Sequence, residues 1–167
     1  IIAAVMAVGS GLLGTSIAML GDMTDSISLY LNRAGAGWPA NTGIRTPTQV
    51  EPLAGGFVEM DNEDVAVYSA YGAKIRTIQP GYARPALAVG NTRFVLYNRA
   101  GKELTVQSRT RQLYAKSFNN AIMLCEMAQN GTLAVVTESD RYAAEVMVYD
   151  ASFSGDPFTW KLTSTDG

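Results

Sequence analysis

The chain has no histidine among its 167 residues. Histidine is the usual general base near neutral pH and the commonest metal ligand, and it activates the nucleophile in most serine and cysteine triads. No paired carboxylates, glycine-rich phosphate loop or cluster of metal ligands stands out in its place. The sequence therefore predicts no catalytic residue, no metal site and no bound cofactor.

Cysteine is almost as scarce, because Cys125 is the only one. A single thiol excludes an internal disulfide, but it leaves the redox compartment of the protein open. Cys125 stands between two methionines, in Met123-Leu-Cys-Glu-Met127, without the basic neighbours that lower the pKa of a reactive thiol. We expect a buried, unreactive side chain at this position.

Charge is sparse as well. Charged residues make up 17% of the chain, and the formal net charge is −2. This charge is too small and too evenly spread to indicate a nucleic-acid surface. The densest acidic run is Asp61-Asn-Glu-Asp64. A calcium loop is one interpretation of this run, but a solvated hairpin turn explains it without a ligand and is favoured.

Residues 1–20 contain no charged residue. Twenty apolar residues in a helix, at about 1.5 Å each, span the hydrocarbon core of a bilayer. We therefore predict a transmembrane helix at residues 1–21, in a single-pass protein whose β domain is extracytoplasmic. The alternatives are a signal peptide, with small residues at Ser16 and Ala18, and a buried helix. Because the chain begins at Ile1, inside this run, we expect it to be a fragment.

Residues 22–52 are predicted to form a first strand and a connector. Ser26-Ile-Ser-Leu-Tyr-Leu31 alternates as a short strand does. The stretch from Arg33 to Pro52 is rich in Gly, Pro, Thr and Asn, and it contains Trp38. It is either a tether or a structured loop in which Trp38 plugs the edge of the domain. The second interpretation is favoured, because a free linker rarely retains a tryptophan.

Residues 53–167 are predicted to form strands joined by turns, with no helix among them. The strands are about five residues long and are separated by turn signals every 8 to 12 residues, which is typical of an all-β domain. We place them at residues 57–60, 65–68, 74–78, 86–89, 94–97, 103–107, 112–116, 122–127, 133–137, 144–149 and 158–162.

A short cassette repeats among these strands: an apolar strand that ends in tyrosine, then a glycine turn and a second strand. Offsets of about 40 residues, with four strands per unit and a strand that is apolar on both faces, are typical of a propeller blade. We therefore predict an all-β fold with a partial propeller-like array of about three blades. The residues assigned to the structure of the repeat are Tyr68, Gly72, Tyr97, Gly101, Gly155 and Trp160.

The third cassette, with Val148-Tyr-Asp150, Ser154-Gly155 and Phe158-x-Trp160, resembles the quinoprotein-type and WD-type propeller repeats. The whole chain resembles an uncharacterised bacterial family of single-pass membrane proteins with a propeller-like ectodomain. That family carries a Gly-aromatic-Pro motif, matched here by Gly37-Trp38-Pro39. The resemblance implies the fold and the membrane topology, and no activity. Closed propellers have about four to eight blades, so we expect the C-terminal end to be truncated too.

Arg109, Arg111 and Lys116, together with Trp38, form the predicted partner surface. These basic residues would meet a protein or an anionic cell-surface polymer, although protection of a solvated strand edge is a competing explanation. The sequence favours a non-catalytic domain for binding or scaffolding. The alternatives are the ectodomain of a membrane sensor and a propeller enzyme, either quinoprotein-like or glycan-processing, with its active site in missing blades.

Overall fold

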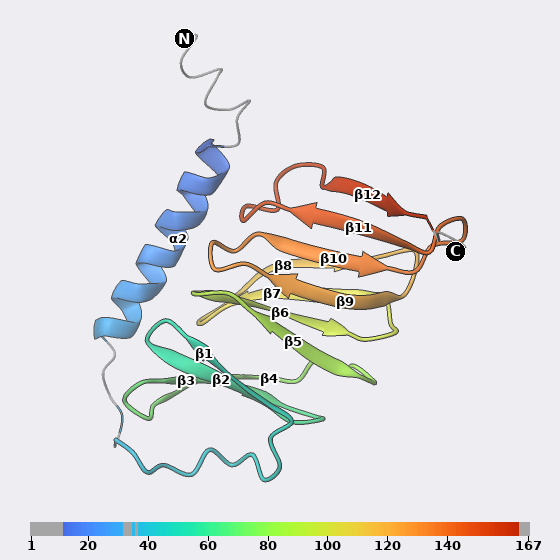
Figure 1. The fold of residues 1–167 in the computed structure, drawn as a ribbon. Coiled ribbons are helices and arrows are strands. Elements are labelled where there is room, and N and C mark those ends of the chain that lie inside the picture. Colours follow the sequence, from blue (N-terminus) through green and yellow to red (C-terminus); the bar gives the residue numbers. More distant parts are fainter. Residues whose placement is uncertain (1–11, 32–34, 36, 164–167) are drawn as a thin grey trace, which may run out of the picture.

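In a computed structural model, which describes residues 12–31, 35 and 37–163, one helix lies beside three four-stranded antiparallel sheets (Figure 1). The helix is α2 (Leu12–Leu31). Blade 1 contains β1 (Gln49–Leu53), β2 (Gly56–Met60), β3 (Val65–Ser69) and β4 (Lys74–Ile78). Blade 2 contains β5 (Pro85–Val89), β6 (Arg93–Asn98), β7 (Glu103–Ser108) and β8 (Gln112–Ser117). Blade 3 contains β9 (Ile122–Met127), β10 (Leu133–Thr137), β11 (Ala144–Tyr149) and β12 (Phe158–Leu162).

Each blade is a meander in which every strand pairs with its neighbours in the sequence. The first strands begin at Gln49, Pro85 and Ile122, so the structural repeat is 36 and then 37 residues. The copies of the predicted cassette do not begin at the same strand of each blade. Its first and third copies span the third and fourth strands of blades 1 and 3, whereas its second copy spans the second and third strands of blade 2. Glycine-turn hairpins thus recur at two places in a blade.

Two hydrophobic cores hold the blades together. The core between blades 1 and 2 contains Leu53, Val58, Met60, Val65, Val67, Leu87, Phe94 and Leu96. The core between blades 2 and 3 includes Val95, Tyr97, Leu104, Val106, Ile122, Cys125, Met127, Leu133 and Val135. The residues of β3 from Val65 to Tyr68, and those of β6 from Phe94 to Tyr97, are apolar and buried, because a strand in the middle of a covered sheet has both faces packed.

All the strands predicted between residues 57 and 162 are present, and the all-β fold class is confirmed. β1 was missed, because Pro52 and the Gly-rich surroundings favoured a connector. Pro52 is tolerated there because β1 pairs only with β2 and is the edge strand of its sheet.

The predicted strand at Ser26–Leu31 is wrong, because these residues continue α2. The hydroxyl groups of Thr24, Ser26 and Ser28 each donate a hydrogen bond of 2.8 Å to a carbonyl oxygen one turn earlier in the helix. These polar side chains therefore find their hydrogen-bond partners within the helix itself.

The predicted transmembrane helix at residues 1–21 is only partly described, since residues 1–11 lie outside the described residues. Over the part of the chain that the structure does describe, no helix has both the length and the hydrophobicity to cross a membrane. α2 contains Asp22 and Asp25, and it lies along the turns at one end of the blades (Figure 1).

Candidate functional site

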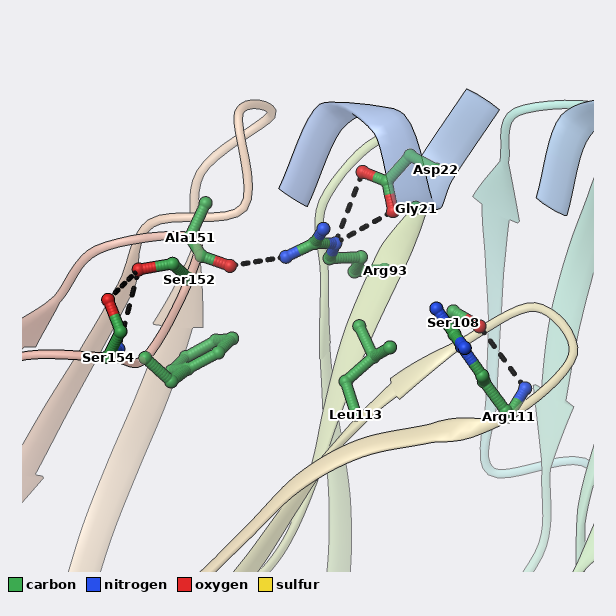
Figure 2. A pocket seen from close by; sticks show the side chains of 10 residues that line it. Gly21, Asp22, Arg93, Ser108, Arg111, Leu113, Ala151, Ser152 and Ser154 are labelled. Carbon is green, nitrogen blue, oxygen red and sulfur yellow. Dashed lines mark hydrogen bonds and ion pairs between the residues drawn. The ribbon is translucent and has the colours of Figure 1, made fainter. Parts of the chain in front are cut away.

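α2 is fixed to the blades by Asp22. The Nε atom of Arg93, at the start of β6, lies 3.0 Å from Oδ1 of Asp22 and 3.2 Å from Oδ2. Thr92 donates a further hydrogen bond of 2.8 Å to Oδ2. Nη1 of Arg93 donates to the carbonyl oxygen of Ala151, in the turn between β11 and β12 (Figure 2). The buried Arg93 guanidinium therefore connects blade 2 with both the helix and blade 3.

A second buried arginine holds α2 one turn later. Arg109, in the turn between β7 and β8, donates to the carbonyl oxygen of Ala54 in blade 1 at 2.7 Å. It also donates to the hydroxyl of Ser26 at 2.7 Å and to the carbonyl oxygen of Asp22 at 3.3 Å. Burial lowers the pKa of the Arg109 guanidinium, and the charges of Asp25 and Asp22 oppose that shift.

We call the line of contacts between α2 and the turns of the blades the helix seam. Asp25 is its buried carboxylate, with 7% of its surface exposed. Thr110 donates a hydrogen bond to its Oδ1 atom. Its charge also opposes the effect of burial, which lowers the pKa of Arg76 in β4. Asp22, Asp25 and Ser26 lie on one side of α2, because residues three and four apart share a helix face. The seam is thus a line of charge-assisted contacts between one helix face and turns of the blades.

A pocket of about 310 Å³ opens where the helix, blade 2 and blade 3 meet. Four parts of the chain line it: the middle of α2, the start of β6, the β7–β8 turn with the strand ends beside it, and the β11–β12 turn (Figure 2). The lining residues are Gly21, Asp22, Arg93, Ser108, Arg111, Leu113, Ala151, Ser152, Phe153 and Ser154.

Blade 3 also presents an exposed apolar face, on the side opposite blade 2. In β10, Leu133 and Val135 point toward blade 2, so the alternate residues point away. Strand register places Val136 beside Val146, Val146 beside Trp160, and Val148 beside Phe158 on that outer face. The largest side chains there are highly exposed: Phe158 at 70%, Trp160 at 64%, Leu124 at 47% and Leu162 at 38%.

The outer face of blade 1, in contrast, is partly covered by the connecting segment. The Trp38 ring lies 5.5 Å from that of Phe57 and 6.3 Å from that of Tyr68, measured between centroids. Trp38 donates from Nε1 to the carbonyl oxygen of Ala70 at 3.0 Å, and the Tyr68 hydroxyl donates to the carbonyl oxygen of Thr42 at 2.5 Å. Trp38 packs against the domain, as predicted.

The structure does not bring the four predicted partner residues together. Arg109 is 3% exposed and is used internally, whereas Arg111, two residues later, is exposed beside the pocket. Lys116 lies near the other end of β8, where its amine sits over the rings of Phe118 and Tyr149. Trp38 belongs to the outer face of blade 1. Asp22 and Asp25 were not predicted, although their spacing with Ser26 was a readable signal once the segment is helical.

The residues assigned to the repeat differ in their packing. Tyr97 and Tyr149 belong to the core between blades 2 and 3, whereas Tyr68 lies on the outer face of blade 1. Gly72 has a φ of +80°, and a side chain there would meet the carbonyl oxygen of Gly37. A side chain at Gly101 would collide with Asn98, Gly155 has open space around it, and Trp160 is exposed.

A family model described as "Family of unknown function (DUF5711)" matches residues 39–164. The chain belongs to this family. The match begins at Pro39 and includes all three blades, so the DUF5711 model describes the β domain together with most of the segment that leads into it. The predicted relationship to an uncharacterised propeller-like family is confirmed at this level. A search among curated proteins found no match.

Solved β-propeller structures resemble the chain in fold. A structure of Kluyveromyces lactis Hsv2 superposes with a TM-score of 0.55 at 11% identity, over 71% of this chain and 38% of that one. HIRA(644–1017) superposes with a TM-score of 0.49 at 11% identity, over 68% of this chain and 39% of that one. BBS1N in complex with ARL6DN superposes with a TM-score of 0.44 at 16% identity, over 74% of this chain and 39% of that one. The chain therefore spans about two fifths of these structures. The likeness to Hsv2 concerns the fold alone.

Proposed function

We propose that this chain is a non-catalytic scaffolding domain that binds a second copy of itself through the outer face of blade 3. The single observation that carries the proposal is the exposed cluster of Phe158, Trp160, Leu162 and Leu124. A contiguous exposed apolar patch of this kind marks an interaction site in a folded protein.

The chemistry of the partner follows from the two interfaces within the chain. Blades 1 and 2, and blades 2 and 3, pack sheet against sheet through apolar faces. The outer face of blade 3 continues this pattern, so an apolar sheet face fits it. A second copy supplies such a face, and two-fold pairing of identical faces is the commonest form of self-association. β9 and β10 carry a single charged residue, Glu126, which lies opposite Ala134 on this face. Electrostatic repulsion between two copies of the face is therefore small.

We further propose that residues 1–21 tether the domain to a membrane, with the blades outside the cytoplasm. This part of the proposal rests on the run of twenty residues without charge at the start of the chain. A fusion of alkaline phosphatase after residue 163 tests the orientation, since that enzyme is active only outside the cytoplasm. Phosphatase activity without fluorescence from the matched cytoplasmic reporter is expected, and the reverse pattern overturns the tether orientation.

Sedimentation analysis of the full chain in detergent tests the self-association. We expect a concentration-dependent dimer that becomes a monomer when Phe158 and Trp160 are both changed to Glu, with an unchanged circular dichroism spectrum. Met23→Glu is the matched control, because Met23 is a 59% exposed apolar residue of α2 and does not belong to the sheet of blade 3.

A Val50→Glu variant identifies the geometry of the dimer. Val50 is 54% exposed on β1, at the opposite end of the array. Pairing between two copies of blade 3 leaves this variant dimeric. A monomer at every concentration, or a dimer that survives the double substitution, contradicts the proposed scaffold. A dimer that Val50→Glu also disrupts contradicts the two-fold arrangement.

A further inference from the structure

The pocket at the junction of α2, blade 2 and blade 3 has a distinctive balance of hydrogen-bonding groups. Its carboxylate, Asp22, is already bound by Arg93 and Thr92. Arg93 is committed to Asp22 and to the carbonyl oxygen of Ala151. These groups hold the fold together and are not available to a ligand.

The serine hydroxyls at the β11–β12 turn are committed as well. Ser152 has one hydroxyl proton, which it donates to Oδ1 of Asp150 at 2.7 Å. The hydroxyls of Ser152 and Ser154 are 2.5 Å apart, so Ser154 must be the donor of that pair. Asp150 accepts further hydrogen bonds from the backbone N–H groups of Ser152 and Phe153. The hydrogen bond from the Ser152 hydroxyl, and then those from the backbone, lower the pKa of the Asp150 carboxyl.

Arg111 is the exception. It lines the pocket and is exposed, and Nη2 of its guanidinium would lie 3.5 Å from a side chain placed at Gly21. Its backbone N–H donates to Ser108, but within the described residues its guanidinium has no hydrogen bond or ion pair. The other charged groups around the pocket balance one another, with Asp22 against Arg93. The guanidinium of Arg111 is therefore available to bind an anion in the pocket.

Two large apolar side chains also line the pocket. Leu113 and Phe153 form its walls, and the Phe153 ring stacks on Tyr114 with centroids 5.0 Å apart. Phe153 has a φ of +55°, a left-handed conformation that is unfavourable for a side chain of this size. The fold thus holds an aromatic ring at the pocket in spite of local backbone strain, a feature that recurs at ligand sites.

We propose that this pocket binds a small carboxylate with an apolar body. The carboxylate pairs with the guanidinium of Arg111, and the apolar part lies between Leu113 and Phe153. A volume of about 310 Å³ is at the lower end of small-molecule sites, which suits a compact ligand of this class. This inference is independent of the proposed self-association, because the pocket lies at the helix seam, away from the outer face of blade 3.

Isothermal titration of the full chain with benzoate, and with benzyl alcohol as the neutral analogue of the same size, tests the proposal. We expect benzoate to bind more tightly than benzyl alcohol. Arg111→Gln should weaken benzoate binding by about tenfold, since a charge-assisted hydrogen bond is lost, and should leave benzyl alcohol unaffected. Arg99→Gln, at an exposed arginine in the turn after β6, is the matched control and should change neither affinity.

The apolar wall is tested separately with Phe153→Gly. Glycine adopts the positive φ of this position without strain, so the variant should fold while the ring is lost. Binding of both probes should then weaken. The proposal is overturned if the wild-type chain binds neither probe, if the two probes bind equally, or if Arg111→Gln and Arg99→Gln have the same effect.

Discussion

Asp22 and Arg93 form an ion pair, with 3.0 Å between Oδ1 and Nε, across 71 residues of sequence. The arginine side chain is 6% exposed and the aspartate 24%. A guanidinium this deeply buried depends on its partner, because a buried charge without a counter-ion is strongly unfavourable. The contact is therefore where the docking of α2 and the integrity of the blades depend on each other.

Asp22→Asn should destabilise the protein. The change leaves the Arg93 guanidinium buried beside a neutral amide, and we expect the free energy of unfolding in urea to fall by about 1 to 3 kcal/mol. Asp156→Asn, at an exposed aspartate, is the control and should change it by less than about 0.5 kcal/mol. Equal stability of the two variants would show that the pair contributes nothing.

The same substitution should also act locally. If Asp22 fixes the helix, amide hydrogen exchange in α2 should accelerate more than exchange in β6, because the helix loses its charge-assisted contacts while the strand keeps its ladder. Uniform acceleration across both elements would instead indicate a global loss of stability with no special role for the docking contact.

Gly72→Ala should destabilise through both backbone and contact. Gly72 has a φ of +80°, and a Cβ atom there would lie 2.8 Å from the carbonyl oxygen of Gly37. Gly81 has a φ of +66° with open space around it, and Gly155 has open space and no such φ. We expect losses of about 2 to 3 kcal/mol for Gly72→Ala, about 1 kcal/mol for Gly81→Ala and almost none for Gly155→Ala, measured by thermal or urea unfolding.

Burial in the core between blades 2 and 3 raises the pKa of the Cys125 thiol to about 12, from an ordinary value of about 9, and the charge of Glu126 adds to the shift. The folded protein therefore favours the neutral thiol. The neutral thiol contributes fully to stability below about pH 9, and this contribution is lost as the pH rises toward about 12. The reason is that the thiol loses its proton at a lower pH in the unfolded chain than in the folded protein.

Urea unfolding between pH 8 and 12 measures this effect on the wild-type chain and on Cys125→Ala, because the range runs from below the ordinary pKa of the thiol up to the raised one. Both lose stability as tyrosines ionise, since burial also raises the pKa of Tyr82 and Tyr149. The loss should be steeper in the wild type. Parallel curves would contradict the raised pKa of the thiol, as would rapid alkylation of the folded protein at pH 8.

Local pattern was enough to predict the strands from β2 to β12, because alternating or continuous apolar residues between glycine turns determine burial within each sheet. It was not enough for α2. Ser26–Leu31 alternates with period two and reads as a strand, yet the segment is helical because Asp25 and Ser26 dock on turns that lie more than 80 residues away. Contacts of that separation leave no trace in a short window of sequence.

The same limit explains Arg109. In the sequence it stands beside Arg111 and appears equivalent to it, and both were assigned to one partner surface. In the fold, one of them donates to Ala54 and Ser26 and is buried, while the other faces a pocket. Only the position of α2 distinguishes the two, so neither the seam nor the pocket could have been predicted before that helix was placed.

The order of synthesis gives the Asp22 contacts a temporal consequence. Asp22 leaves the ribosome before Thr92 and Arg93, which follow it by 70 and 71 residues, and Ala151 follows Arg93 by a further 58. At typical elongation rates the first of these gaps alone lasts about 4 to 14 seconds. During that interval the helix has nothing to dock on, and the apolar segment before it is accessible to whatever meets the nascent chain. The contacts of Asp22 and Arg93 can therefore be complete only after blades 2 and 3 have been synthesised.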